Sequence, residues 1–168
     1  MRKFFAMLLA AVLCLSLAAC GGNGGEQEVT VDAAAMFGAL QNEVTYPDTA
    51  TTLDSSMAGV LLGGELPEGT EAYLAANDSA YLRCAVFACQ DAEAAKTAAA
   101  VVQRYIDDSI DAKYNPDEVA LLQKATVHTN GRYVAVAVTD DADGVDKVIA
   151  KICAYFAATS STPSTKTA

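Results

Sequence analysis

The chain has 168 residues, of which 52% are hydrophobic and 19% charged, and its formal net charge at pH 7 is −10. This length is ordinary for one domain with a proper hydrophobic core. Nucleic acid and anionic lipid headgroups repel such an acidic chain, so a nucleic-acid partner is excluded. We interpret the acidity as a source of solubility rather than as a dedicated cation-binding role.

Residues 1–19 have the pattern of a lipoprotein signal peptide. Arg2 and Lys3 form a short cationic region, and residues 4–19 contain no charged side chain. This apolar run is shorter than the roughly 20 residues of a membrane-spanning helix. It ends in Leu17-Ala18-Ala19-Cys20, which resembles a bacterial lipobox: a branched residue, two small residues and then a cysteine.

Cys20 is therefore the predicted lipidation site. In signals of this kind a diacylglycerol group, with acyl chains such as palmitate, is attached to the cysteine sulfur, and the chain is cut before that residue. Two acyl chains anchor a protein stably, whereas one chain binds a membrane only marginally. The alternatives are an uncleaved anchor helix and an ordinary secretory signal, but Leu17 stands where the ordinary peptidase prefers a small residue.

The rest of the chain divides into three parts. Residues 20–29 carry the lipidated cysteine and a flexible, glycine-rich tether, residues 30–157 form a single α+β domain, and residues 158–168 form a disordered Ser/Thr-rich tail. Cleavage leaves nine basic against 21 acidic residues. We expect an acidic domain held on the extracytoplasmic side of the cell membrane.

The first half of the domain begins with two helices. Thr30 is placed to cap the first, and Asp54 to cap a second, short helix that Gly63 ends. Two strands follow at residues 71–76 and 80–89, joined by a turn at residues 77–79. The first helix has one apolar stripe, made of Ala33, Met36, Phe37, Leu40 and Val44.

The second half of the domain alternates helices with a hairpin. Asp91 starts the longest helix, and Asn115-Pro116 both ends it and starts a short helix. Asn130-Gly131 predicts a tight hairpin turn between about residues 124–129 and 132–138. A final helix carries an apolar stripe of Val145, Val148, Ile149, Ile152 and Phe156. The order of elements predicts an α+β fold of two layers, with a four-stranded, mostly antiparallel sheet of two β-hairpins and the helices on one face.

Aromatic side chains are expected on the sheet face away from the helices, where polar residues are usual. Such a face is a candidate docking surface for a protein or a flat ligand, because tyrosine combines area with a polar tip. The alternative is that the tail, the tether or a second copy covers it. The candidate interaction face consists of Tyr73, Tyr81, Phe87 and Tyr133.

Cys84, Cys89 and Cys153 are expected as small buried thiols. Cys84 and Cys89 lie about 16 Å apart along a strand, too far for a disulfide. Whether Cys153 pairs with either of them stays open.

No group of residues predicts catalysis, a metal site or a cofactor. His128 is the only histidine, so a zinc site lacks ligands, and we expect it to face solvent from a strand. Residues 139–144 contain acidic residues but lack two of the oxygens that a calcium loop needs, so Asp140 or Asp141 is expected to cap the last helix. Asp107 and Asp111 are interpreted as part of a solvated helix face.

The order of motifs resembles a family of uncharacterised lipoproteins of Gram-positive gut bacteria, whose domain has no assigned function. The resemblance covers roughly residues 30–155 and implies a location and a fold but no chemistry. The corresponding residues are Val86-Phe87, Asp91, Tyr114 and Pro116, Gly131-Arg132-Tyr133-Val134, and Asp140-Asp141.

These observations favour a non-enzymatic interaction or ligand-binding module at the cell envelope. The membrane, through the lipid on Cys20, and an envelope protein are its expected partners. The alternatives are an envelope enzyme with an unrecognised site and the accessory lipoprotein of a transporter. A deep polar pocket would favour the enzyme, and a flat aromatic face would favour the interaction module.

Overall fold

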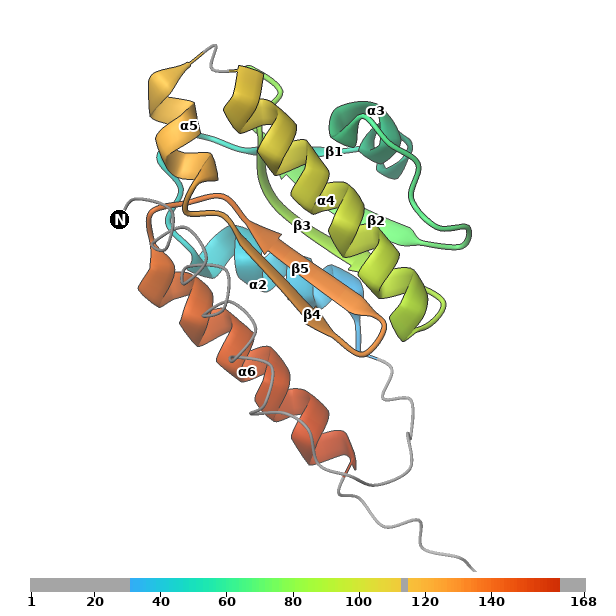
Figure 1. Ribbon diagram of the computed structural model, residues 1–168. Coiled ribbons are helices and arrows are strands. Elements are labelled where there is room, and N and C mark those ends of the chain that lie inside the picture. Colours follow the sequence, from blue (N-terminus) through green and yellow to red (C-terminus); the bar gives the residue numbers. More distant parts are fainter. Residues whose placement is uncertain (1–30, 113–114, 161–168) are drawn as a thin grey trace, which may run out of the picture.

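The computed structural model describes residues 31–112 and 115–160 (Figure 1). The predictions for the signal peptide, Cys20, the tether, Thr30 and residues 161–168 lie outside these ranges. The predicted tail begins too early, because residues 158–160 belong to the last helix. In chain order the elements are α2 (Ala33–Glu43), β1 (Thr51–Leu53), the 3-10 helix η2 (Ser55–Met57), α3 (Ala58–Leu62), β2 (Glu71–Ala76), β3 (Leu82–Ala88), α4 (Ala92–Ala112), α5 (Pro116–Leu122), β4 (Thr126–Asn130), β5 (Tyr133–Ala137) and α6 (Ala142–Ser160).

The predicted α+β class is confirmed, and the sheet is antiparallel throughout. Its strand order is β1-β2-β3-β5-β4, so the two predicted hairpins lie side by side through β3 and β5. The sheet has five strands rather than the predicted four. The additional strand, β1, pairs three residues with the outer edge of β2. Three residues are too few for a period-two pattern to reveal a strand.

The predicted arrangement of helices on one face is wrong, because helices cover both faces of the sheet. Helices α3, α4 and α5 lie on one face and α2 and α6 on the other (Figure 1). The second face carries no charged side chain in the centre of the sheet. Helices must therefore cover it to keep its apolar residues out of water. Its buried residues are Ala75, Cys84, Val86, Ala88, Tyr133, Ala135 and Ala137.

A β-bulge at Arg83 breaks the alternation of β3. Ala75 pairs with Cys84 and Ala76 pairs with Leu82, which leaves Arg83 as the extra residue. Leu82 therefore packs with Phe87 in the core under α4 instead of sharing the face of Cys84, as strict alternation predicts. The bulge directs the Arg83 side chain toward the end of the sheet at α5.

The second hairpin turns one residue later than predicted. Asn130 pairs with Tyr133, so Gly131 and Arg132 are the two turn residues. Gly131 has φ +54°, whereas Arg132 is not among the residues with positive φ, and glycine tolerates this conformation at the first turn position. The apolar residues Val134, Val136 and Val138 alternate along the chain and all enter the core under α4.

Side-chain caps begin most of the helices. The predicted caps Asp54, Asp91 and Asn115 are confirmed, since each carboxylate or amide oxygen accepts hydrogen bonds from backbone N–H groups of the turn that follows. Helix α2 is capped by Asp32 and not by the predicted Thr30, because the helix begins at Ala33. Its predicted apolar stripe is buried along its whole length.

Candidate functional site

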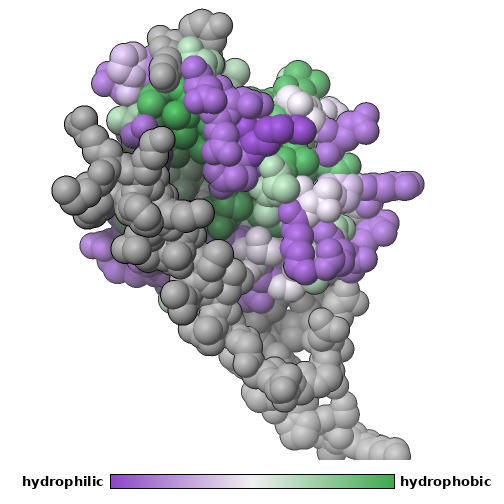
Figure 2. Space-filling model, viewed as in Figure 1, coloured by the Kyte–Doolittle hydropathy of each residue, from purple (hydrophilic) through white to green (hydrophobic). Residues whose placement is uncertain are grey.

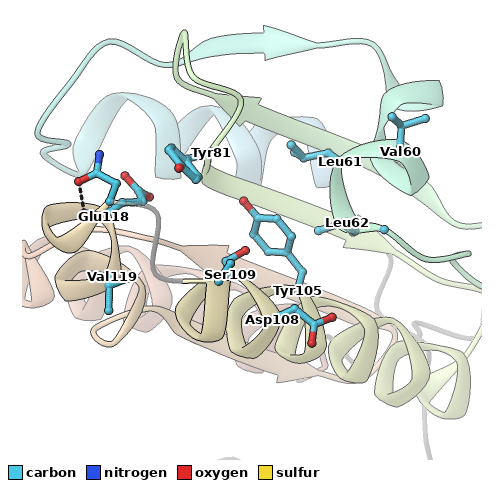
Figure 3. A pocket seen from close by; sticks show the side chains of 12 residues that line it. Val60, Leu61, Leu62, Tyr81, Tyr105, Asp108, Ser109, Glu118 and Val119 are labelled. Carbon is cyan, nitrogen blue, oxygen red and sulfur yellow. Dashed lines mark hydrogen bonds between the residues drawn. The ribbon is translucent and has the colours of Figure 1, made fainter.

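A cavity of about 340 Å³ opens between α3, α4 and α5 (Figure 3). Its walls combine hydrocarbon, two tyrosine rings, two carboxylates and several small polar groups. In Figure 2, hydrophobic residues gather on the surface at α3, beside the hydrophilic outer face of α4. The lining residues are Val60, Leu61, Leu62, Gly63, Tyr81, Tyr105, Asp108, Ser109, Ala112, Asn115, Glu118 and Val119.

Short helices at two ends of the cavity are held in place by their terminal residues. Gly63 ends α3 in the left-handed conformation, at φ +61°, which only glycine adopts easily. Asn115 accepts hydrogen bonds from the backbone N–H groups of Asp117 and Glu118, with Pro116 at the first helical position. These ends fix the walls on either side of α4.

Tyr105 lies at the centre of the lining (Figure 3). It projects from α4 and is almost fully buried, and its hydroxyl accepts a hydrogen bond of 3.1 Å from the backbone N–H of Leu82. Burial raises the pKa of Tyr105 above its ordinary value. The ring is therefore a fixed, neutral surface against which a small molecule can pack. Tyr81, which is half-buried, stands beside it.

Glu118 joins the cavity to a buried ion-pair network. The guanidinium of Arg83 lies 2.7 and 2.8 Å from the two Glu118 oxygens and at the same distances from the two oxygens of Asp48. Arg83 is 1% exposed and Glu118 about 5%, whereas Asp48 reaches solvent. Burial alone lowers the pKa of Arg83, but its hydrogen bonds with Asp48 and Glu118 outweigh this, and the pKa is raised.

The rim of the cavity is more exposed than its wall. Asp108 is exposed and Ser109 half-buried, one after the other on α4. Val60, on α3, is 73% exposed, which is unusual for a large apolar side chain next to a cavity. The mouth thus offers hydrocarbon on the α3 side and carboxylate on the α4 side.

The predicted interaction face does not form. Phe87 is fully buried under α4, and Tyr133 is 2% exposed under α2 and α6, on the opposite side of the sheet. Tyr73 packs against Phe37 of α2, with ring centroids 6.3 Å apart. Only Tyr81 of the four lines the cavity. The prediction failed because it left one sheet face bare and because β3 pairs Phe87 with Val134 and not with Tyr133, which places these two rings on opposite faces.

His128 is half-buried rather than facing solvent. It lies on the sheet side under α6, with Nε2 3.8 Å from Sγ of Cys153, and Nδ2 of Asn130 lies at the same distance from that sulfur. Burial lowers the pKa of His128, so the ring is neutral at pH 7. A neutral imidazole does not stabilise a thiolate, and the cavity lies elsewhere, so this group does not form the candidate site.

No disulfide joins the three domain cysteines within the residues that the structure describes, and the three differ in exposure. Cys84 and Cys89 are buried and Cys153 is half-buried. Burial raises the pKa of Cys84 to about 11 and also raises that of Cys89, so both are protonated at pH 7. The prediction of small buried thiols is confirmed for these two.

We expect the native protein to react with a thiol reagent at Cys153 before it reacts at Cys84 or Cys89. Reactivity depends on access and on the thiolate fraction, and both are low at the two buried residues. Labelling followed by mass spectrometry, with Cys153→Ser as the control, measures this. Equal labelling of Cys84 and Cys153 in the native state would contradict it.

Asp141 is a helix cap, as predicted, and not part of a calcium loop. One carboxylate oxygen accepts from the N–H of Gly144 at the start of α6, and the other accepts from the N–H of Thr45, at 3.0 and 2.9 Å. Hydrogen bonds from Thr45 and Gly144 lower its pKa. In residues 31–112 and 115–160, no group of three or more His, Cys, Asp or Glu side chains is arranged to hold a metal ion.

The fold and cavity define a class: an antiparallel five-stranded sheet between two layers of helices, with a small-molecule-sized cavity at one end of the longest helix. Comparison of the chain with protein-family models, curated proteins and solved structures finds no match. No helix of the described residues has the length and apolarity to cross a membrane. The resemblance to Gram-positive lipoproteins stays a prediction.

Proposed function

We propose that the chain is a lipid-anchored, extracytoplasmic domain that binds a small molecule in the cavity between α3, α4 and α5. The anchor rests on the sequence around Cys20. The binding role rests on the cavity itself, whose volume of about 340 Å³ falls at the lower end of the range for small-molecule sites. The cavity is the observation that carries the proposal.

The chemistry of the cavity supports binding more than catalysis. Its described lining supplies carboxylates, hydroxyls and one amide, but no histidine, cysteine or lysine. These residues therefore lack the imidazole, thiol and amine groups that often serve as nucleophile or base in covalent catalysis. Apolar walls with a few oriented polar groups are what retains and selects a ligand.

The loss of the predicted aromatic face also favours a small ligand over a flat protein partner. The aromatic side chains that sequence alternation assigned to one surface instead fill two cores, apart from Tyr81. The concave surface that remains is the cavity. Of the two predicted roles, ligand binding is therefore favoured over interaction with a protein. The segment before residue 30 would tether this ligand-binding module close to the membrane.

Replacing Cys20 with alanine is expected to release the protein from the membrane. Without the thiol no thioether to diacylglycerol forms, and the acyl chains that supply stable anchoring are absent. The measurement is fractionation of a Gram-positive host that expresses the full-length chain, with mass spectrometry of the N-terminal peptide. Cys14→Ala is the matched control, because that cysteine lies within the predicted signal peptide, and it should leave anchoring unchanged.

Filling the cavity is expected to abolish ligand binding without unfolding the domain. Ser109→Phe places a ring between Tyr105 and Glu118, where Ser109 points (Figure 3). The measurement is NMR of the full-length chain with neutral, cationic and anionic aromatic fragments, following the amides of the lining residues Gly63 and Val119, which the substitution leaves in place. Ala100→Phe, on the exposed face of the same helix, is the control. The binding role fails if no fragment shifts these amides.

A further inference from the structure

We propose that the cavity between α3, α4 and α5 selects a small organic cation, an amine or ammonium group carried on an apolar body. This inference rests on the proposed function, because it names the class of ligand for the same site. It is carried by the charges of the lining, by the bonding of Arg83 and by the placing of the two tyrosine rings.

Every charged side chain among the described lining residues is a carboxylate. Glu118 stands in the wall on α5, and Asp108 stands at the mouth on α4. The domain as a whole is acidic, which raises the local concentration of cations near its surface. An anionic ligand would meet repulsion from both carboxylates, and a cation would meet attraction from both.

Arg83, the cation behind the cavity wall, has no N–H group left to bind a ligand. A guanidinium has five N–H donors. Those of Arg83 are all in use: two reach Asp48, two reach Glu118, and the last reaches the carbonyl oxygen of Leu82 at 3.3 Å. Arg83 therefore neutralises part of the carboxylate charge but cannot bind a ligand carboxylate or phosphate.

Arg104 is the other arginine near the site, and it lies outside the lining. Its guanidinium is next to Gly64, one residue beyond the end of the wall that Gly63 forms. Within residues 31–112 and 115–160, Arg104 forms no ion pair with Asp108. Asp108 thus keeps its negative charge available at the mouth.

The carboxylate at the wall retains acceptor capacity. Each oxygen of Glu118 accepts one N–H of Arg83, and a carboxylate oxygen has room for a second hydrogen bond. An ammonium group has donors in three directions and can share Glu118 with Arg83. Burial of the wall strengthens such a charged contact relative to water.

The two tyrosines complete the site for a cation. Tyr81 and Tyr105 lie between Glu118 at one end of the cavity and Leu61 and Leu62 at the other (Figure 3). The face of an aromatic ring attracts a positive charge, and its plane packs well on hydrocarbon. The arrangement fits a ligand with its charged end toward α5 and its apolar end toward α3, where Val60 is exposed.

The size of the cavity suits a compact molecule. About 340 Å³ corresponds to roughly ten water molecules at about 30 Å³ each. A phenyl ring with a two-carbon amine fits within this volume. The expected class is therefore a small monoamine or a compact quaternary ammonium compound.

The test compares three probes of similar shape and different charge: 2-phenylethylamine, 2-phenylethanol and 3-phenylpropionate. Each is titrated into the full-length chain at low ionic strength, with NMR shifts of the amides of Gly63 and Ser109 as the readout. We expect the amine to bind at least about fivefold tighter than the alcohol, and the carboxylate to bind weakest. Added salt should weaken binding of the amine more than binding of the other two probes.

Two variants separate the charge effect from folding. Asp108→Asn should weaken the amine about threefold and leave the alcohol unchanged, because it removes charge from an exposed side chain at the mouth. Asp107→Asn is the matched control on the same helix, outside the cavity. It should change the affinity for the amine and for the alcohol by no more than about 1.5-fold. Tyr81→Leu should weaken the amine more than the alcohol.

The outcomes distinguish this inference from the proposal beneath it. If the alcohol or the carboxylate binds at the cavity as tightly as the amine, or if Asp108→Asn leaves the amine unaffected, selection of a cation is overturned and a binding cavity stands. If none of the three probes shifts the cavity amides, both proposals fail.

Discussion

Replacing Arg83 with methionine is expected to lower the free energy of unfolding by about 3–5 kcal/mol. The substitution keeps much of the volume but removes the partner of Glu118, which is buried, and leaves its carboxylate without compensation. The carbonyl oxygen of Leu82 also loses its hydrogen bond from Arg83. Urea unfolding, followed by circular dichroism, measures the change.

A double variant tests the reason for this loss. Arg83→Met combined with Glu118→Leu removes both buried charges, and stability should recover most of the way, because a buried ion pair seldom exceeds well-packed hydrocarbon in stability. Asp48 stays where water can solvate it. The exposed pair of Lys151 and Glu43 is the control, and Glu43→Ala should cost less than about 1 kcal/mol. If Arg83→Met alone lowers the free energy of unfolding by less than about 1 kcal/mol, the buried ion pair with Glu118 is not the cause of the stability.

The same network makes stability depend on acid. The hydrogen bond with Arg83 is the largest cause that lowers the pKa of Asp48 below its ordinary value of 3.8, and a hydrogen bond from Asn77 lowers it further. A lowered folded-state pKa adds stability above the unfolded pKa, and this stability is lost as the pH falls through the folded value. The unaltered protein should therefore lose stability below about pH 4 more steeply than Asp48→Asn does.

Local patterns predicted most of the elements. The stripe in α2 and the capping residues Asp54, Asp91, Asn115 and Asp141 all depend on neighbours within a few positions, where spacing alone decides the outcome. The turn at Gly131 was misplaced by a single residue, because either Asn130 or Arg132 can flank the glycine in a tight turn. Such errors concern boundaries rather than the existence of an element.

The layer arrangement depended on residues far apart in the chain. An apolar stripe on α2 and another on α6 each require a surface to cover, and the alanine-rich face of β3 and β5 is that surface. The prediction that this face has no helices on it was wrong, and the aromatic residues assigned to the face already indicated that it is buried. The bulge at Arg83 had one visible sign: a charged residue inside an otherwise apolar strand.

The candidate site could not be assembled from the sequence. Tyr81 follows a turn, Tyr105 lies in the middle of α4, and Glu118 stands in the first turn of α5, where the local pattern indicates only an acid favourable to a helix N-terminus. Only the packing of α3 and α5 against α4 brings them together. Asp108 lies on an exposed helix face, and this face borders a cavity that no local pattern encodes.

Replacing Tyr133 with phenylalanine is expected to lower the free energy of unfolding by about 2 kcal/mol. The hydroxyl accepts the N–H of Val31 at 2.9 Å and donates to the carbonyl oxygen of Val31 at 3.0 Å. Both backbone groups are buried, so removing one oxygen leaves a donor and an acceptor unsatisfied. Amide exchange at Val31 should accelerate along with global unfolding, and urea unfolding measures the total.

Tyr73→Phe is the matched control for this prediction. Tyr73 packs on Phe37 through its ring, its hydroxyl makes no hydrogen bond within the described residues, and its loss should stay within about 0.5 kcal/mol. Tyr133 differs from Tyr73 because its hydroxyl fixes the first residues of the domain to β5, next to the point where the predicted tether begins. Equal losses in the two variants would show that the Val31 contact does not hold this end of the chain.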